Sequence, residues 1–291
     1  MMSVRARSFA PVKAGGALLP LLPVCWLTIV FVVPLGVTLV YSFAHSEFAR
    51  VQLGFTTDNY KEAWSGFYVD VFLRTIRFAA TGTALVMAAA VPVAYTCARK
   101  SGRFKLALLV LLLVPFWTSF LVRVLSWRTL LDQGGLVEQI LNGLHLHSGN
   151  LAWLDTPTAV FIGIVYAYMP LAVIPLFVAF ERIPDATIEA SKDLGANSWR
   201  TFRSVTLPLA RPGLVAATLL TFVPMTGEFV IPGLLGGAKG ALYGSTIQSV
   251  YLSSADYPLG SAMAISLLLV VGLAITLIGL ASRRAGQGQT A

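Results

Sequence analysis

The sequence predicts an all-α membrane protein with six transmembrane helices and with its N- and C-termini in the cytoplasm. Of its 291 residues, 56% are apolar and only 12% are charged, about half the charged share of an average soluble domain. This composition excludes an ordinary soluble enzyme, a disordered chain and a secreted disulfide scaffold. The apolar residues gather into six stretches of the length that crosses a bilayer as a helix, roughly 17–43, 72–98, 104–125, 158–180, 212–234 and 259–281.

The first stretch is predicted to be a retained helix that follows a short cytoplasmic tail, residues 1–16. Basic residues precede it, as they precede the apolar core of a signal peptide, at Arg5, Arg7 and Lys13. The apolar run is too long for such a core, however, and no clear small-residue cleavage site follows it. We therefore expect one membrane domain over residues 17–281 and a second cytoplasmic tail over residues 282–291.

The lysines and arginines predict the orientation of these helices. If the N-terminus is cytoplasmic, 14 of the 21 lysines and arginines lie on that side, within residues 1–16, 99–105, 181–211 and 282–291. An excess of these residues marks the cytoplasmic loops of membrane proteins. The sequence pI of about 9.7 and the formal charge of +8 therefore reflect membrane orientation and not a nucleic-acid partner.

Two long loops are predicted on the outer side. Residues 44–71 are polar and aromatic, whereas residues 126–157 contain a glycine turn and then an apolar stretch, 136–144, that predicts a short interfacial helix. Prolines at or near the middle of the apolar stretches are expected to kink those helices, at Pro92, Pro115, Pro170, Pro175 and Pro224.

The cytoplasmic loop 181–211 is predicted to contain two short helices. Pro184 and Asp185 indicate the start of the first, because proline is tolerated before or within the first turn and aspartate can cap it. We expect this helix over residues 186–194, and we expect it to end at Gly195 in a left-handed turn.

The second short helix is expected after a cap by Asn197 or Ser198. It carries Trp199 and Phe202 and ends at residues 207–208, before the next apolar stretch. These residues leave two interpretations open. Either the two helices form a knob with exposed aromatic side chains that docks into a partner's groove, or the loop lies on anionic lipid headgroups as an amphipathic segment.

Several residues of this loop resemble the EAA motif of ABC importer permeases. They are Glu189, Ala190 and Ser191, then Gly195, and then Val205, Thr206, Leu207 and Pro208. The spacing matches the motif throughout, and the two departures, Ser191 for alanine and Val205 for isoleucine, are small in volume. A full motif in a cytoplasmic loop of a six-span chain is a specific signature of that family.

The resemblance extends over nearly the whole chain. Residues 114–123, 163–170 and 227–237 are similar to segments of the spermidine/putrescine permeases, among which the putrescine permeases resemble the chain most. This resemblance implies the type I ABC importer permease fold and a multi-pass location in the bacterial inner membrane. It also implies ATP-driven, binding-protein-dependent import of polyamines, in which the chain couples closure of an ATPase to alternating access.

The same resemblance implies three kinds of protein partner. A second permease subunit would complete the pathway as a heterodimer, an ATPase dimer would dock on the cytoplasmic side, and a periplasmic solute-binding protein would deliver the solute. The motif residues would then contact the ATPase, and we add Trp199 and Phe202 to that contact for their aromatic side chains.

We predict a non-catalytic subunit that binds no cofactor, metal or nucleic acid. The chain has no Gly-x4-Gly-Lys-Ser/Thr loop, so ATP and Mg²⁺ are expected in the partner ATPase. His145 and His147 could bind a metal, but no third ligand lies near them in the sequence. Cys25 and Cys97 both lie in apolar stretches, which indicates core packing.

Four residues are candidates for lining the substrate pathway. Glu228 is the only acidic residue deep in a predicted span, where a carboxylate is costly and usually faces the bundle interior or water. Its charge would offset part of the desolvation of a polyamine's ammonium groups. The alternative is a structural glutamate, protonated or paired with an arginine of the partner subunit. Trp117, Tyr166 and Tyr168 are candidates for cation–π contacts, although aromatic residues in spans more often serve packing or interface anchoring.

Three alternative functions are weaker. A secondary transporter or channel would need ion-coupling charges at the midplane and an internal repeat. A membrane enzyme would need clustered histidine, aspartate, serine or cysteine residues in the spans. An importer permease of the same class could carry another small solute, such as an aminophosphonate, an opine, iron or sulfate, because the separate binding protein sets most of the specificity.

Overall fold

The computed structural model of the chain describes residues 21–47, 50–145, 153–237 and 241–287. The predicted tail 1–16, His147 and the end of the predicted tail 282–291 lie outside the described residues. The first α-helices are α1 (Leu21–Tyr41), α2 (Asp58–Ala63), α3 (Gly66–Arg99), α4 (Lys105–Leu113), α5 (Phe120–Leu131), α6 (Leu136–Gly143) and α7 (Pro157–Glu181). They are followed by α8 (Asp185–Asp193), α9 (Ser198–Thr201), α10 (Leu207–Leu209), α11 (Arg211–Thr226), α12 (Val230–Leu235), α13 (Tyr243–Leu252) and α14 (Tyr257–Gln287). Shorter elements are the 3₁₀ turns η2 (Gly102–Phe104) and η3 (Val114–Trp117), the π-helical turn η4 (Phe202–Thr206), and the strands β1 (His45–Glu47) and β2 (Arg50–Gln52).

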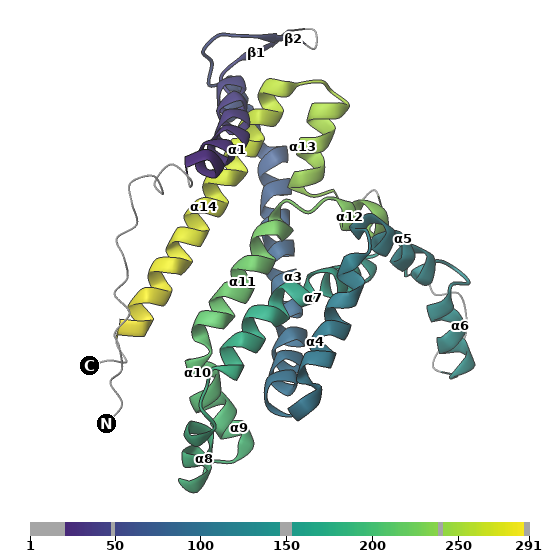
Figure 1. The fold of residues 1–291 in the computed structure, drawn as a ribbon. Coiled ribbons are helices and arrows are strands. Elements are labelled where there is room, and N and C mark those ends of the chain that lie inside the picture. The colour runs from purple at the N-terminus through teal and green to yellow at the C-terminus, as the bar shows by residue number, and fades with distance from the viewer. Residues whose placement is uncertain (1–20, 48–49, 146–152, 238–240, 288–291) are drawn as a thin grey trace.

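Four helices within the described ranges are long and apolar enough to cross a membrane as continuous spans. They are Pro23–Tyr41, Gly66–Arg99, Pro157–Glu181 and Tyr257–Leu280. These helices correspond to the first, second, fourth and sixth predicted spans. Figure 1 shows the β1–β2 hairpin at one end of the molecule and the short helices α8 and α9 at the opposite end.

The third predicted span, residues 104–125, is not one straight helix. The helical segments Gly102–Trp117 and Phe120–Gly143 meet at a bend of 93°. Pro115 lies in the turn before the bend, and Thr118 has an extended backbone while its hydroxyl donates to the Pro115 carbonyl oxygen at 2.7 Å. The bend lies close to the kink expected at Pro115, and it interrupts the helix where hydropathy alone indicates one apolar stretch, because hydropathy does not report the backbone bonds that proline removes.

The fifth predicted span, residues 212–234, is interrupted too. α11 ends at Thr226, residues 227–229 leave the helical conformation, and α12 begins at Val230. At its other end, α11 makes a bend of 72° with the helical segment Ser198–Leu209. The described chain therefore has four continuous candidate spans, and up to six if each bent pair is one span.

The helices α3, α7 and α11 pack against one another and hold the main apolar core. The contact face of α3 carries buried side chains of small or moderate size at spacings of three or four, namely Ala79, Thr83, Val86, Ala90, Ala94 and Cys97. Between α7 and α11, a Cβ added to Gly213 would lie 2.3 Å from the Ala179 Cβ and 2.9 Å from the Pro175 carbonyl oxygen. Such close approach holds helices together in a bilayer, where lipid supplies little hydrophobic drive for association.

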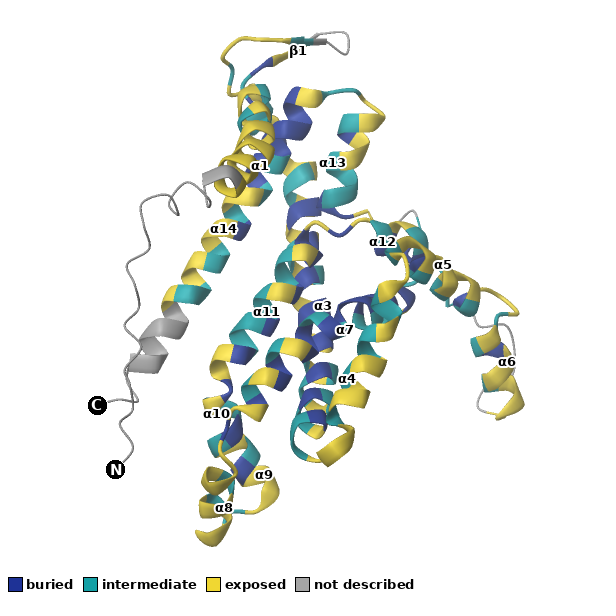
Figure 2. Cartoon of the chain, in the orientation of Figure 1, coloured by how far each residue is buried: buried dark blue, intermediate teal, exposed yellow. Residues whose placement is uncertain are grey.

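A second group of elements lies beside this core. α14 contacts α1, α2 and α13, and the antiparallel hairpin pairs His45 with Gln52. The side chain of Asn59 donates to the carbonyl oxygens of Ser42 and Ala44, which fixes the chain after α1. Figure 2 shows that α1 is largely exposed along its length, and none of its candidate span is buried inside the chain.

The short helix predicted over residues 136–144 is confirmed as α6. It follows Gly134, whose φ of +71° is a left-handed conformation that glycine adopts without strain. α5 and α6 project from the core as an arm (Figure 1). Leu136 and Ile140, one turn apart on α6, are both about half exposed, so this arm presents an apolar stripe.

The close approach of α7 and α11 leads to a stability prediction. Gly213→Ala should lower the free energy of unfolding by about 1–3 kcal/mol, because the added methyl group meets backbone and Cβ atoms that cannot rotate away. Thermal unfolding in detergent, followed by tryptophan fluorescence, measures this change. Gly272→Ala on α14 is the matched control, since nothing lies within 4 Å of a Cβ there. Equal melting temperatures for the two variants would contradict the close contact.

Candidate functional site

The loop between α7 and α11 forms a compact knob, residues 185–206, at the end of the molecule opposite the hairpin (Figure 1). The first predicted helix is confirmed as α8. The expected cap by Asp185 is wrong: Pro184 occupies the N-cap position without a side-chain hydrogen bond, and Asp185 lies in the first turn. The Asp185 carboxylate instead accepts a hydrogen bond from Arg99 at the end of α3.

The elbow of the knob has the predicted geometry. Gly195 has a φ of +83°, so its left-handed turn is confirmed, and a Cβ added there would meet no atom within 4 Å. Of the two candidate caps, Asn197 is the one used, since its side-chain oxygen accepts from the backbone N–H of Arg200 at 2.8 Å. Ser191 and Thr201 hydroxyls are hydrogen-bonded at 3.1 Å and join α8 to α9.

The predicted end of the second helix at Leu207 and Pro208 is wrong. The chain continues from α9 through the π-helical turn η4 into α10, and the bend comes at Ala210. Pro208 has no N–H to donate inside this helical segment, and it lies directly after the π-helical turn η4, where the regular hydrogen-bond pattern is already interrupted.

The exposed surface of the knob differs from the expected one at one aromatic residue. Trp199 is 69% exposed, as expected, and Glu189 and Ala190 are exposed on α8. Phe202 is partly buried and makes ring contacts with Tyr95 of α3 and Phe180 of α7, at centroid distances of 5.2 and 6.4 Å. Phe202 therefore anchors the knob to the membrane helices, and the Trp199 ring stacks against it at a centroid distance of 5.9 Å.

Sequence reasoning missed Leu194, which is 89% exposed at the elbow. The sequence feature that could have identified Leu194 is its position, as an apolar residue directly before the glycine of a polar loop. Leu194 and Trp199 together give the tip of the knob an apolar surface, which suits protein docking better than free exposure to water.

A cavity of about 980 Å³ lies between the knob and α3. Its wall on the α3 side is apolar along Met87 and Val91 and becomes basic at Arg99 and Lys100, whereas the knob contributes Glu189 and Trp199. Leu207 and Phe202 complete the lining near the bend. The motif residues thus border a hollow in addition to an outer surface.

The second cluster surrounds Glu228, which is not inside a helix as the span prediction placed it. It lies in the break between α11 and α12 and is only 7% exposed. One carboxylate oxygen accepts the backbone N–H groups of Val230 and Ile231 at 2.8 and 3.2 Å, and the other accepts the Tyr168 hydroxyl at 2.6 Å. The side chain therefore caps α12 and joins it to α7, and no arginine contacts it among the residues the structure describes.

The four pathway candidates do not form one site. Tyr168 contacts Glu228, whereas Tyr166 packs edge-on against Trp127 with ring centroids 5.4 Å apart. Residues two positions apart on a helix are separated by about 200° around its axis, which explains why the two tyrosines diverge. Tyr166 borders a separate cavity of about 360 Å³ with Phe116 and Met169. Trp117 is 84% exposed at the bend before α5.

The chemistry available to these clusters is binding and coupling. Within the described ranges, no group of three histidine, cysteine, aspartate or glutamate residues could hold a metal ion. The knob offers an apolar tip with flanking charges, and the Glu228 pair offers a buried carboxylate between two membrane helices.

Known proteins resemble the chain over most of its length. The family model described as "Binding-protein-dependent transport system inner membrane component" matches residues 90–287. The chain is 35% identical to the spermidine/putrescine transport system permease protein PotB of Escherichia coli (strain K12), over 80% of the chain and 85% of that protein. It is 32% identical to PotB of Haemophilus influenzae, over 86% of the chain and 88% of that protein.

A solved structure shares the fold. It is a bacterial alginate ABC transporter in complex with an alginate pentasaccharide-bound periplasmic protein, and one of its chains matches with a TM-score of 0.70. The match covers 92% of this chain and 93% of that chain at 17% identity, so it bears on the fold alone.

The Tyr168–Glu228 bond gives a second stability prediction. Tyr168→Phe leaves a buried carboxylate oxygen without its donor, which should lower the free energy of unfolding by about 1–3 kcal/mol. Tyr166→Phe is the matched control two residues away, because the Tyr166 hydroxyl makes no hydrogen bond to any described residue. Denaturation of both purified variants in detergent measures the difference. Indistinguishable stabilities would show that the hydroxyl does not support the carboxylate.

Proposed function

Because the chain belongs to the family of inner membrane components of binding-protein-dependent transport systems, we propose that it is a permease subunit that imports polyamines. Subunits of this family are multi-pass proteins of the inner membrane and are not catalytic, and ATP is hydrolysed by a separate subunit. The observation that carries the polyamine assignment is the 35% identity with PotB over four fifths or more of both chains. The range of amines includes putrescine and spermidine, the two named for that relative.

The partners follow from the same assignment. A second permease subunit forms the other half of the pathway, an ATPase dimer docks on the cytoplasmic side, and a periplasmic protein delivers the polyamine. ATP and Mg²⁺ belong to the ATPase, and this subunit holds no cofactor. The solved alginate transporter, which is bound to a periplasmic protein, supports an assembly of this type. The basic residues on the knob side support a cytoplasmic knob and cytoplasmic termini.

The knob is the element that receives the ATPase. Its tip, with Leu194 and Trp199, enters the partner, while Glu189, Ala190 and Ser191 lie on the neighbouring helix α8. Phe202 transfers the motion, because its ring packs between α3 and α7 at the base of the knob. Nucleotide binding elsewhere thereby favours one of two arrangements of the membrane helices.

The pathway runs past the break between α11 and α12. A chain of ammonium groups leaves water at a high cost, which a buried carboxylate reduces. Glu228 supplies that charge, and Tyr168 and the α12 backbone hold it in place. Trp117 and Tyr166 lie apart from this pair, so the proposal rests on Glu228 and Tyr168.

Uptake measurements test the cargo and the carboxylate together. We expect proteoliposomes with the complete transporter to import radiolabelled putrescine when ATP and the binding protein are present. Glu228→Gln keeps the volume and can still accept the α12 N–H groups, but it removes the charge. Uptake should fall about tenfold, as expected for one lost bond to a charged group, while assembly is unchanged.

Glu138→Gln is the control for that experiment, because Glu138 is a buried glutamate that also accepts a backbone N–H, from Gly134 in the arm. Unchanged uptake kinetics in Glu228→Gln would contradict the pathway role. Absence of putrescine and spermidine uptake in the unmodified transporter would contradict the polyamine assignment.

The elbow of the knob gives a test of coupling. Gly195→Val should raise the ATP hydrolysed per putrescine imported, because a β-branched residue in the left-handed conformation costs about 1–2 kcal/mol or more. Gly195→Asn should be tolerated, since asparagine adopts this conformation more readily. Parallel assays of ATP hydrolysis and uptake in proteoliposomes measure the ratio. Normal coupling in the valine variant would show that docking does not need this turn.

A further inference from the structure

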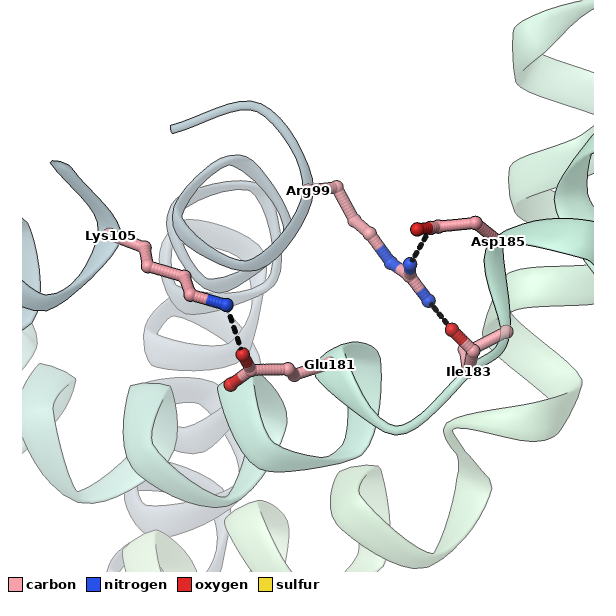
Figure 3. Close-up of polar contacts among 5 residues, drawn as sticks. All are labelled: Arg99, Lys105, Glu181, Ile183 and Asp185. Atoms are coloured by element: carbon pink, nitrogen blue, oxygen red, sulfur yellow. Dashed lines mark hydrogen bonds and ion pairs between the residues drawn. The ribbon is translucent and has the colours of Figure 1, made fainter. Parts of the chain in front are cut away.

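A single arginine at the end of α3 holds the connection between α7 and the knob together with the first turn of α8 (Figure 3). α7 ends at Glu181 and α8 begins at Asp185, so a short connection joins a membrane helix to the docking helix. Arg99, the last residue of α3, donates to the Asp185 carboxylate at 2.5 Å and to the Ile183 carbonyl oxygen. Its guanidinium therefore bridges the connection to the first turn of α8.

The exposed fractions of the Arg99 and Asp185 side chains differ widely. The Arg99 side chain is 12% exposed, whereas the Asp185 side chain is 83% exposed. An ion pair with so exposed a carboxylate contributes little by charge alone. The Arg99 Nε is also buried and has no hydrogen-bond partner among the described residues. An arginine held there at such a cost is best explained by its planar fork, which reaches two acceptors at once.

A neighbouring ion pair provides a contrast. Lys105 of α4 contacts Glu181, the last residue of α7, on the same side of the molecule (Figure 3). Both members of that pair lie before the connection, so the pair ties α4 to α7 without reaching α8. Of the contacts drawn in Figure 3, only those made by Arg99 reach residues beyond the end of α7.

We propose that Arg99 is a positioning residue that holds the first turn of α8 against the end of α3 and thereby fixes the hinge, residues 182–184, which joins α7 to α8. Through it, a displacement of the docked knob reaches α3, and α7 packed against α3, as a rigid movement and is not absorbed by the hinge. This role rests on the proposed function of the knob as the ATPase docking element. The knob is then joined to the membrane helices in two ways: by the hydrogen bonds of Arg99 from α3 and by the ring contacts of Phe202 at its base.

The hinge angle can be measured directly in the reconstituted transporter. Spin labels are placed on cysteines at Val178 of α7 and Asp193 of α8, in a background where Cys25 and Cys97 are replaced by serine. Pulsed electron paramagnetic resonance gives the distribution of distances between the labels. We expect a narrow distribution in the parent protein and a broad one in Arg99→Ala. Lys105→Ala is the matched control and should leave the distribution narrow.

Conservative variants separate the fork from its charge. Arg99→Lys keeps the charge but cannot bridge two acceptors in one plane, so it should broaden the distribution nearly as much as Arg99→Ala. Asp185→Asn keeps an acceptor oxygen and should have a smaller effect. Both Arg99 variants should raise the ATP hydrolysed per putrescine imported by about tenfold, the effect of one lost bond to a charged group.

The outcomes are distinguishable. A narrow distribution in Arg99→Ala, or a lysine variant that matches the parent protein, overturns the positioning role. A broad distribution with unchanged coupling overturns the transmission of motion through Arg99. If the parent chain binds no ATPase and Arg99→Ala still broadens the distance distribution, the hinge contact is supported and the proposed function of the knob is overturned.

Discussion

The close packing of α7 against α3 and α11 is the constraint on which the other features depend. Gly213 lets α11 lie against the backbone of α7, and the buried face of α3 meets α7 from another side. From this fixed position, α7 presents Tyr168 to the helix break and Phe180 to the base of the knob. Its last residue, Glu181, contacts Lys105 at the start of α4, and Ile183, just after α7, accepts a hydrogen bond from Arg99 at the end of α3. Both candidate sites are therefore attached to the same helix.

The breaks in the membrane helices are possible because protein groups replace the lost backbone bonds. A bilayer interior offers no water to satisfy a free N–H or carbonyl group. At the end of α11, the Glu228 carboxylate accepts two N–H groups of α12, and in the turn before α5 the Thr118 hydroxyl bonds the Pro115 carbonyl oxygen. A side chain that looks functional because it is charged also has a structural task, and the two roles are compatible at Glu228.

Local patterns predicted the local features well. Apolar length gave the four continuous helices, and glycine and asparagine in the loop gave the turn at Gly195 and the cap at Asn197. Kinks were expected at Pro115 and Pro224, and a break follows each of them within a few residues, but hydropathy averages over residues and does not report how far the helix is interrupted. Long-range contacts were missed for a different reason. Arg99 and Asp185 are 86 positions apart, and nothing in either neighbourhood indicates the other.

The empty space around Gly195 has a consequence for how a side chain there would act. Because an added Cβ meets no neighbour, its penalty comes from the backbone torsion alone. That penalty applies to every state of the transport cycle that retains the turn and disappears in any state that relaxes it. Within this chain, a residue at this position thus changes relative populations without altering a packing contact. A series of substitutions at Gly195 with increasing torsional penalty would report what fraction of the transport cycle the chain spends with this left-handed turn formed.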